Sequence, residues 1–188
     1  MPKNKAVPLA IFLLAVPIGI AIGTEEEPKP QRYSPPTRSF YCDIPAGWHP
    51  FEEEDSLGNV VHILGPDSPS GNYRTGIDIR RAEKNQPDYL PIAKVIEDLR
   101  RTDPYTGRTA TGVRPMRISG ILSRTFEIVE NRRLPAGHLP SFSEELHHYV
   151  AVIPSGASYF IIRLSSTRDI YLDYRKLFID FLRSFKPA

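Results

Sequence analysis

The sequence contains a single cysteine, Cys42, and a single tryptophan, Trp48. One cysteine excludes an internal disulfide and any zinc module built from several cysteines. The charged residues are close to balance, with 24 lysines and arginines against 22 aspartates and glutamates. This balance shows none of the basic excess of nucleic-acid-binding proteins, so we expect no nucleic-acid partner. A glycine-rich phosphate loop and a G-x-S-x-G nucleophile motif are also missing, so the sequence predicts no catalytic residues and no cofactor.

Long hydrophobic runs are missing everywhere except at the start of the chain. There, Lys3 and Lys5 precede an uncharged stretch, residues 6–23, that ends just before three consecutive glutamates. A basic start, an apolar centre and small residues before a polar segment are typical of a secretory signal peptide, which we assign to residues 1–23. If it is not cleaved, the same stretch is an N-terminal anchor at the short limit of the ~20 residues that span a bilayer.

Both interpretations place the rest of the chain on the outer side of the membrane, because the two lysines stay on the inner side. We therefore expect an exported protein, in the periplasm or outside the cell, that contacts the membrane only through its N-terminal segment if that segment is retained. Residues 24–38 follow, rich in proline and glutamate. They have too few apolar side chains to offset the entropy lost on ordering. We expect a disordered linker there, serving as a spacer, as a docking tail, or simply as the mature N-terminus.

The remaining residues, 39–188, are predicted to form one domain with six to seven strands and two main helices. The alternation and turn patterns indicate strands at 39–45, 59–64, 74–82, 114–119, 121–130, 146–153 and 159–164, and helices at 89–101 and 169–185. Most links between strands are of hairpin length, so the sheet should be mostly antiparallel. The last two strands are apolar on both faces, which favours a helix on each side of the sheet. Residues 132–143 are expected to form a long loop.

Two stretches of this domain resemble the PsbP-like family. The first is FYCDIPAGWHP, in which the resemblance rests on Phe40, Ile44, Pro45, Gly47 and Trp48. The second is the last hairpin and helix, in which it rests on Tyr149, Tyr159, Ile161, Tyr171, Phe178, Ser184 and Phe185. The resemblance covers residues 39–188 and implies an α/β (α+β) fold, an α/β/α sandwich around an antiparallel sheet.

The same resemblance implies a secreted or lumenal, non-enzymatic module. Relatives act as extrinsic subunits or assembly factors of membrane complexes, above all of the photosystem II oxygen-evolving complex. A eukaryotic factor with this fold binds the small GTPase Ran. No catalytic set belongs to the family, so the resemblance supplies no catalytic residues to this chain.

Histidines are the candidate metal ligands. His147 and His148 are adjacent on a predicted strand and should point to opposite faces, so they cannot bind one metal ion together. A site formed by either of them with His62 requires their strands to be neighbours. Partly buried or surface histidines without a metal are the alternative, and we assign no metal site, with His62 and His148 as the residues to examine. Cys42 is expected in the core, because nothing near it in sequence would activate a thiolate.

Trp48 and Phe51 are candidate anchors for a protein partner, since exposed aromatic residues often dominate interfaces. The alternative for Trp48 is a side chain that plugs the edge of the core. Arg132 and Arg133 are candidate docking arginines, unless their charges are simply dispersed on the surface. The acidic run at residues 52–55 is expected at a solvated strand end or hairpin rather than in a calcium loop.

These observations predict an exported, non-catalytic binding or assembly module that acts on a membrane-associated protein complex. Two other functions stay open. One is a small metal-dependent or hydrolytic enzyme, and the other is a periplasmic ligand carrier with a pocket between sheet and helix.

Overall fold

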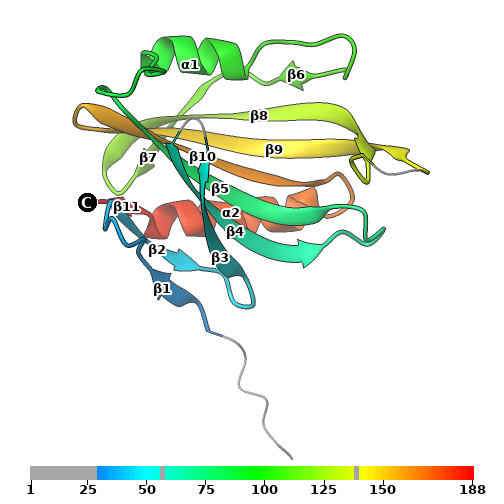
Figure 1. Ribbon diagram of the computed structural model, residues 1–188, viewed down its shortest axis with the longest axis horizontal. Coiled ribbons are helices and arrows are strands. Elements are labelled where there is room, and N and C mark those ends of the chain that lie inside the picture. Colours follow the sequence, from blue (N-terminus) through cyan, green and yellow to red (C-terminus); the bar gives the residue numbers. More distant parts are fainter. Residues whose placement is uncertain (1–28, 56–57, 138–139) are drawn as a thin grey trace, which may run out of the picture.

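The computed structural model describes residues 29–55, 58–137 and 140–188 of the chain (Figure 1). A large antiparallel sheet has the strand order β3-β4-β5-β10-β9-β8-β6, with β7 paired to β8, and a small sheet has the order β1-β2-β11. The strands are β1 (Gln31–Tyr33), β2 (Phe40–Ile44), β3 (His49–Asp55), β4 (Gly58–Asp67), β5 (Arg74–Glu83), β6 (Thr109–Ala110), β7 (Arg114–Ile118), β8 (Ile121–Leu134), β9 (Phe142–Ser155), β10 (Ser158–Thr167) and β11 (Lys186–Pro187). The helices are α1 (Ile92–Leu99) and α2 (Tyr171–Ser184).

The centre of the large sheet is the hairpin of β9 and β10, whose side chains are apolar on both faces. One face carries Tyr149, Ala151, Ile153, Phe160, Ile162 and Leu164, all buried in the larger core cluster. The other face carries Val150, Val152 and Tyr159, which belong to a second, smaller cluster. Because side chains alternate between the faces of a strand, a strand that is apolar throughout must be covered on both sides.

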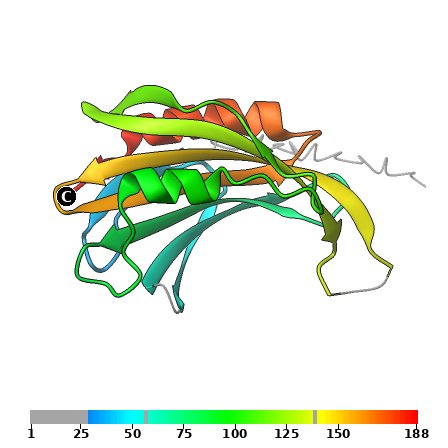
Figure 2. The same ribbon diagram turned by 90° about the horizontal axis from the view of Figure 1, so that it is seen from above.

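Each face of the sheet has its own cover. Figure 2 shows α1 and α2 on opposite sides of the large sheet. Helix α2 buries Phe178, Phe181 and Leu182 in the larger cluster, and the small sheet joins it on that side through Phe40 and Cys42. Helix α1 buries Val95 in the smaller cluster on the other side. The predicted α/β/α sandwich with a mostly antiparallel sheet is therefore confirmed.

The structure has more strands than the sequence predicted. The acidic run belongs to β3, which forms a hairpin with β4, and β1, β6 and β11 are too short to leave a periodic pattern. The long loop predicted at residues 132–143 is wrong, because β8 continues to Leu134 and β9 begins at Phe142. In this extension Arg132 lies opposite Glu144, and opposite charges across a strand pair stabilise the pairing.

The expected linker at 24–38 also needs correction in its second half. Residues 31–33 form β1, which pairs with β2, and the Tyr33 hydroxyl donates a hydrogen bond of 2.7 Å to Glu52 Oε1. Pro35 is buried. One side-chain hydrogen bond, one buried proline and three paired residues thus order a segment whose composition alone predicts disorder. The assigned signal peptide, residues 1–23, and linker residues 24–28 lie outside the described residues; among the described ones, no helix is long and apolar enough to span a membrane.

Cys42 lies in the core, as predicted, with its side chain fully buried between the small sheet and α2. Burial raises the pKa of its thiol to about 12, so the thiolate is negligible at neutral pH. We expect the native protein to react with the thiol reagent DTNB only at the rate at which the fold opens. The same protein in concentrated urea should react at once with one equivalent per chain, and a fast reaction of the native protein would contradict this placement.

Candidate functional site

A groove runs along the α1 side of the large sheet. Helix α1 packs over β8, β9 and β10, where it contacts Phe126, Val150 and Tyr159. Beyond the end of α1 at Leu99, a cavity of about 230 Å³ is lined by Leu99, His62, Asp78 and Arg163 among others. A second cavity of about 110 Å³ shares Asp78 and Arg163 with the first and extends to His148 and Ser165. We call these two adjoining cavities the α1-side groove.

The first polar group in this groove crosses three neighbouring strands. His62, Asp78 and Arg163 lie opposite one another on β4, β5 and β10. Arg163 donates to Asp78 Oδ2 from Nη2 at 2.7 Å, and His62 Nδ1 lies 2.7 Å from Asp78 Oδ1. Burial alone would raise the pKa of Asp78, but Arg163 and His62 lower it below its usual value. The carboxylate is therefore ionised and holds both partners in fixed positions.

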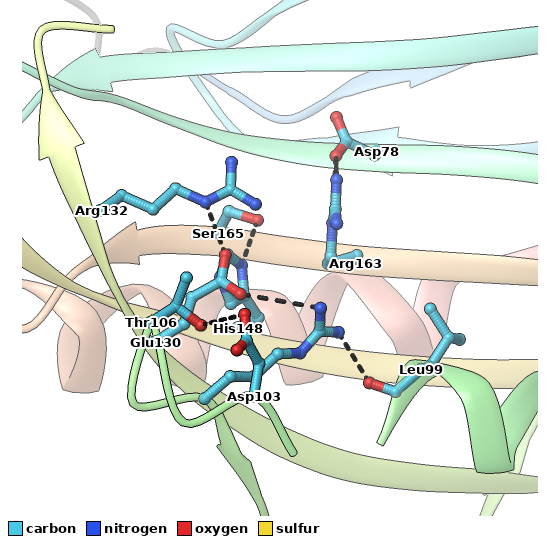
Figure 3. A network of polar contacts seen from close by, with 10 residues as sticks. Asp78, Leu99, Asp103, Thr106, Glu130, Arg132, His148, Arg163 and Ser165 are labelled. Atoms are coloured by element: carbon cyan, nitrogen blue, oxygen red, sulfur yellow. Dashed lines mark hydrogen bonds and ion pairs between the residues drawn. The ribbon is translucent and has the colours of Figure 1, made fainter. Parts of the chain in front are cut away.

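The second polar group consists of His148, Ser165 and Glu130 and begins two residues beyond Arg163 on β10, as Figure 3 shows. His148 Nδ1 is 2.7 Å from Ser165 Oγ, and His148 Nε2 is 3.4 Å from Glu130 Oε1. Burial lowers the pKa of His148, although Glu130 opposes this, so the imidazole is neutral at pH 7. With its proton on Nε2, it faces the carboxylate and accepts from the serine hydroxyl through Nδ1.

Glu130 is the centre of this second group. Its side chain is only 6% exposed, and Arg132 Nε lies 2.6 Å from Oε1 while Arg108 Nη1 lies 3.7 Å from Oε2. His148, followed by Arg132 and Arg108, lowers the pKa of Glu130 to about 2 against the effect of its burial. A buried carboxylate is stable only when it has such partners.

Arg108 connects this carboxylate to α1. Its Nη2 donates to the backbone carbonyl of Leu99 at 2.7 Å, at the end of the helix (Figure 3). The turn before it is closed by Thr106, which donates to Asp103 Oδ2 at 3.0 Å, and Asn131 N donates to the carbonyl of Thr106. The groove is therefore preorganised, because the helix end, the turn and β8 are fixed to one another by polar contacts.

The side chains of Ser165, His148 and Glu130 are in contact in the order of a serine–histidine–carboxylate relay. The surroundings of Ser165 decide whether the three residues can act as one. Ser165 is 6% exposed and lies in β10, which is paired on one side with β5 and on the other with β9. Backbone N–H groups that belong to these ladders are not available to an oxyanion, which acyl transfer requires. The arrangement is therefore that of a buried polar network rather than of an activated nucleophile.

A fluorophosphonate probe tests this conclusion. We expect no covalent adduct on the native protein under conditions in which a known serine hydrolase is fully labelled, because Ser165 is only 6% exposed and the backbone N–H groups of β10 are engaged in the sheet. The variant Ser165→Ala should be indistinguishable from the wild type in this assay. Labelling of the wild type that disappears in Ser165→Ala would establish a hydrolase.

The predicted anchor residues are separated by the fold. Trp48 is buried, 6% exposed, with its ring 5.6 Å from that of Tyr174, so its interpretation as an exposed anchor is wrong and that as a core plug is right. Phe51 is 54% exposed and stacks on the His62 ring at the rim of the groove. Arg132 faces the groove, whereas Arg133, the next residue on β8, points to the opposite face. The two arginines thus do not form one docking patch.

His62 and His148 do not come together. Strands β5 and β10 lie between β4 and β9, so the two backbones are about 14 Å apart at ~4.8 Å per strand. The condition for a shared metal site, neighbouring strands, is not met. His147 and His148 do point to opposite faces as predicted: the ring of His147 contacts Tyr171 of α2. Within residues 29–55, 58–137 and 140–188, no group of three or more potential ligand side chains is placed to hold a metal ion.

The sequence analysis missed four residues of the groove: Asp78, Glu130, Arg163 and Ser165. A signal exists for Glu130, Arg163 and Ser165, because each lies on a strand face that also carries apolar residues. Asp78 gives no such signal, since its face of β5 also carries Arg74 and Arg80. Arg163 interrupts the apolar stretch of β10, and Glu130 follows Phe126 and Ile128 on one face of β8. Which of these interruptions meet in space depends on the strand register, which local sequence does not contain.

Comparisons with known proteins identify the fold. No protein-family model and no curated protein matches the sequence. Among solved structures, a protein of unknown function from Pseudomonas aeruginosa has a TM-score of 0.53 at 14% identity, covering 85% of this chain and 98% of its own. Cyanobacterial PsbP (CyanoP) from Synechocystis has a TM-score of 0.50 at 18% identity, covering 92% of this chain and 100% of its own.

The Ran-binding protein Mog1p from Saccharomyces cerevisiae has a TM-score of 0.51 at 11% identity, with 85% of this chain and 96% of its own covered. At such identities the likeness concerns the fold, since function depends on the site that each protein builds on it. The chain therefore has the PsbP/Mog-type fold that the resemblance of residues 40–50 and of the last hairpin and helix predicted.

Proposed function

We propose that the chain is an exported binding or assembly module that acts on a membrane-associated protein complex and catalyses no reaction. The observation that carries the proposal is Phe51, a large aromatic side chain left 54% exposed beside the fixed polar groups of the α1-side groove. Interfaces between proteins combine such an aromatic anchor with polar groups held in place before binding. The fold supports the same function, because it is shared with a Ran-binding protein and with cyanobacterial PsbP.

Export is part of the proposal and rests on the sequence. Residues 1–23 have the basic start, apolar centre and small residues of a secretory signal. A protein exported in this way works at the outer face of the membrane, where its partner must also be exposed. The position of Phe51 on β3, the first strand of the large sheet, leaves it accessible to a large partner.

Site-specific photo-crosslinking in intact cells tests the function. A benzoylphenylalanine placed at position 51 should give one discrete adduct with a membrane-associated protein. The matched control is position 172, where Leu172 is 76% exposed on α2, on the opposite side of the sheet. The same adducts from both positions, or none from position 51, would contradict a partner surface at the groove.

A ligand carrier remains a second candidate because of a cavity on the α2 side. About 480 Å³ lie between α2 and the start of the small sheet, lined in part by Pro45, Leu177 and Phe181. This volume is within the range of small-molecule sites, ~300–1,000 Å³. Native mass spectrometry of protein purified from its source without unfolding discriminates the two functions: a retained small molecule supports a carrier, and a bare chain excludes one that binds tightly.

A further inference from the structure

The smaller cavity of the α1-side groove has an unusual wall. Its polar lining consists of three arginines, a tyrosine, a histidine and a serine, together with one carboxylate: Arg74, Arg132, Arg163, Tyr73, His148, Ser165 and Asp78. Its volume of about 110 Å³ is that of three to four water molecules at ~30 Å³ each. It therefore has room for one compact polar group and not for a whole nucleotide.

The three arginines come from different strands, β5, β8 and β10, and each is held by a carboxylate. Arg163 contacts Asp78 at 2.7 Å, Arg132 contacts Glu130 at 2.6 Å, and Arg74 donates from Nε to Asp67 at 2.8 Å. These contacts fix the guanidinium groups before any ligand arrives. A ligand that meets a fixed set of donors loses less free energy to ordering the site than one that must assemble it.

The arginines and their carboxylates are equal in number, but they do not contribute equally to the surface of the cavity. Among the described residues that line the cavity, Asp78 is the one carboxylate that accompanies the three arginines. Glu130 and Asp67 contact their arginines without lining the cavity. The surface of the cavity therefore offers guanidinium groups of three arginines against one carboxylate, and their N–H groups suit an anionic ligand.

Hydrogen-bond donors are also left over. A guanidinium has five N–H donors, and the contacts with Asp78 engage Nε and Nη2 of Arg163. The contact with Glu130 is made by Nε of Arg132. Burial raises the pKa of Tyr73, so its hydroxyl stays protonated beside Ser165 at the wall of the cavity. Several converging donors suit a tetrahedral oxyanion better than a planar carboxylate, which offers only two oxygens.

We propose that this cavity binds a phosphate group, either as inorganic phosphate or as the phosphate of a small ester. The organic part of an ester has a place, because the adjoining cavity of about 230 Å³ shares Asp78 and Arg163 and is walled by Val60, Val150 and Ile161. The site lies in the same groove as the proposed partner surface, but its test is separate, since it requires only the purified chain.

The purified full chain is titrated with inorganic phosphate, with potassium chloride of equal ionic strength as the reference, and the ring signals of His148 and Tyr73 are followed by NMR. Phosphate should shift both signals in a saturable way, and chloride should not. Arg132→Gln should weaken phosphate binding at least about tenfold, as the loss of a charge-assisted hydrogen bond does. Arg133→Gln, the same change one residue further on the opposite face of β8, should change it less than about twofold.

Arg74→Gln is the second variant, chosen because both Arg74 and its partner Asp67 are half exposed and the fold does not depend on them. It should also weaken binding while leaving the melting temperature unchanged. Phenyl phosphate and inorganic phosphate are then compared: tighter binding of phenyl phosphate assigns the site to esters, and tighter binding of inorganic phosphate assigns it to the free anion. Equal shifts with phosphate and chloride, or equal affinities in Arg132→Gln, Arg74→Gln and Arg133→Gln, overturn the site.

Discussion

Replacing Glu130 by glutamine should lower the free energy of unfolding by about 3 kcal/mol, because it removes one partner from a buried ion-pair network. The carboxylate, 6% exposed, lies against Arg132, Arg108 and His148. Glutamine has nearly the same shape, so the packing is retained and the loss is that of charge. Arg108 would then be left beside a neutral amide at the end of α1. Urea unfolding followed by circular dichroism measures the change.

The matched control for this variant is Glu97→Gln on α1. Glu97 pairs with Lys94 at 3.2 Å, but its side chain is 69% exposed. Exposed ion pairs of this kind contribute ~0.5 kcal/mol or less to stability. Equal destabilisation by the two substitutions would mean that the Glu130 network does not hold the groove together.

The same substitution should change how stability depends on pH. In the wild type the folded-state pKa of Glu130 is lowered to about 2, below the ordinary value of 4.5. The unfolded chain therefore binds the proton first, and the stabilisation is present above pH 4.5 and is lost as the pH falls towards 2. Glu130→Gln removes this part of the acid destabilisation, so the difference in stability between wild type and variant should shrink from pH 5 to pH 2.

His148 also makes the folded state less stable as the pH falls, but it does so at a higher pH than Glu130. Its folded-state pKa is lowered from 6.5 by burial, so the unfolded state takes up a proton that the folded state excludes. Stability is then lost as the pH falls below 6.5, and this loss persists in Glu130→Gln, because removing the carboxylate takes away the group that favoured protonation. A wild type whose stability stays constant between pH 7 and pH 5 would contradict a buried, neutral His148.

The central part of the fold was predictable from local pattern. A strand that is apolar on both faces, such as β10, has to lie between two covering layers, and the apolar stripe of α2 supplies one of them. The Pro154–Ala157 segment correctly predicted the hairpin between β9 and β10. These features depend on residues close together in sequence, which is why they could be identified without a structure.

The groove was not predictable in the same way. Asp78 and Arg163 are 85 residues apart, and His148 and Ser165 are 17 apart. Each pair forms because the register of β10 with β5 and β9 places the residues in contact, and a shift by one residue would turn them to opposite faces. The sequence shows that a polar residue interrupts an apolar strand; only the register shows which interruptions meet.

The N-terminal segment illustrates a different limit. Residues 31–33 have no strand pattern and lie among prolines, yet β1 pairs with β2. The stabilising contacts of Tyr33 are with Glu52 on β3 and with Phe40. Composition predicts disorder when a segment cannot bury enough apolar surface by itself. It contains no information about the surface of the folded domain against which the segment can pack.

Trp48 and Phe51 were both candidate anchors in the sequence, with a core plug as the alternative for Trp48, and their truncation should separate them. Trp48→Ala should lower the free energy of unfolding by about 3–5 kcal/mol, as removal of a large core aromatic does. The indole lies on Tyr174 and directly on Gly65, where an added Cβ would come within 2.7 Å of its ring. Phe51→Ala removes a ring that is 54% exposed and should cost less than about 1 kcal/mol. Urea unfolding of both variants measures these values.

A third variant makes the assignment of Trp48 independent of truncation. Gly65→Ala leaves the indole in place but brings a methyl group against it, so it should destabilise the protein by about 1–3 kcal/mol through overpacking. In the double variant Trp48→Ala with Gly65→Ala the added methyl meets no ring, so the two costs should not add. Additive costs would show that the indole does not lie on Gly65. Phe51→Ala, by contrast, should leave stability nearly intact, because an exposed side chain contributes little to the core.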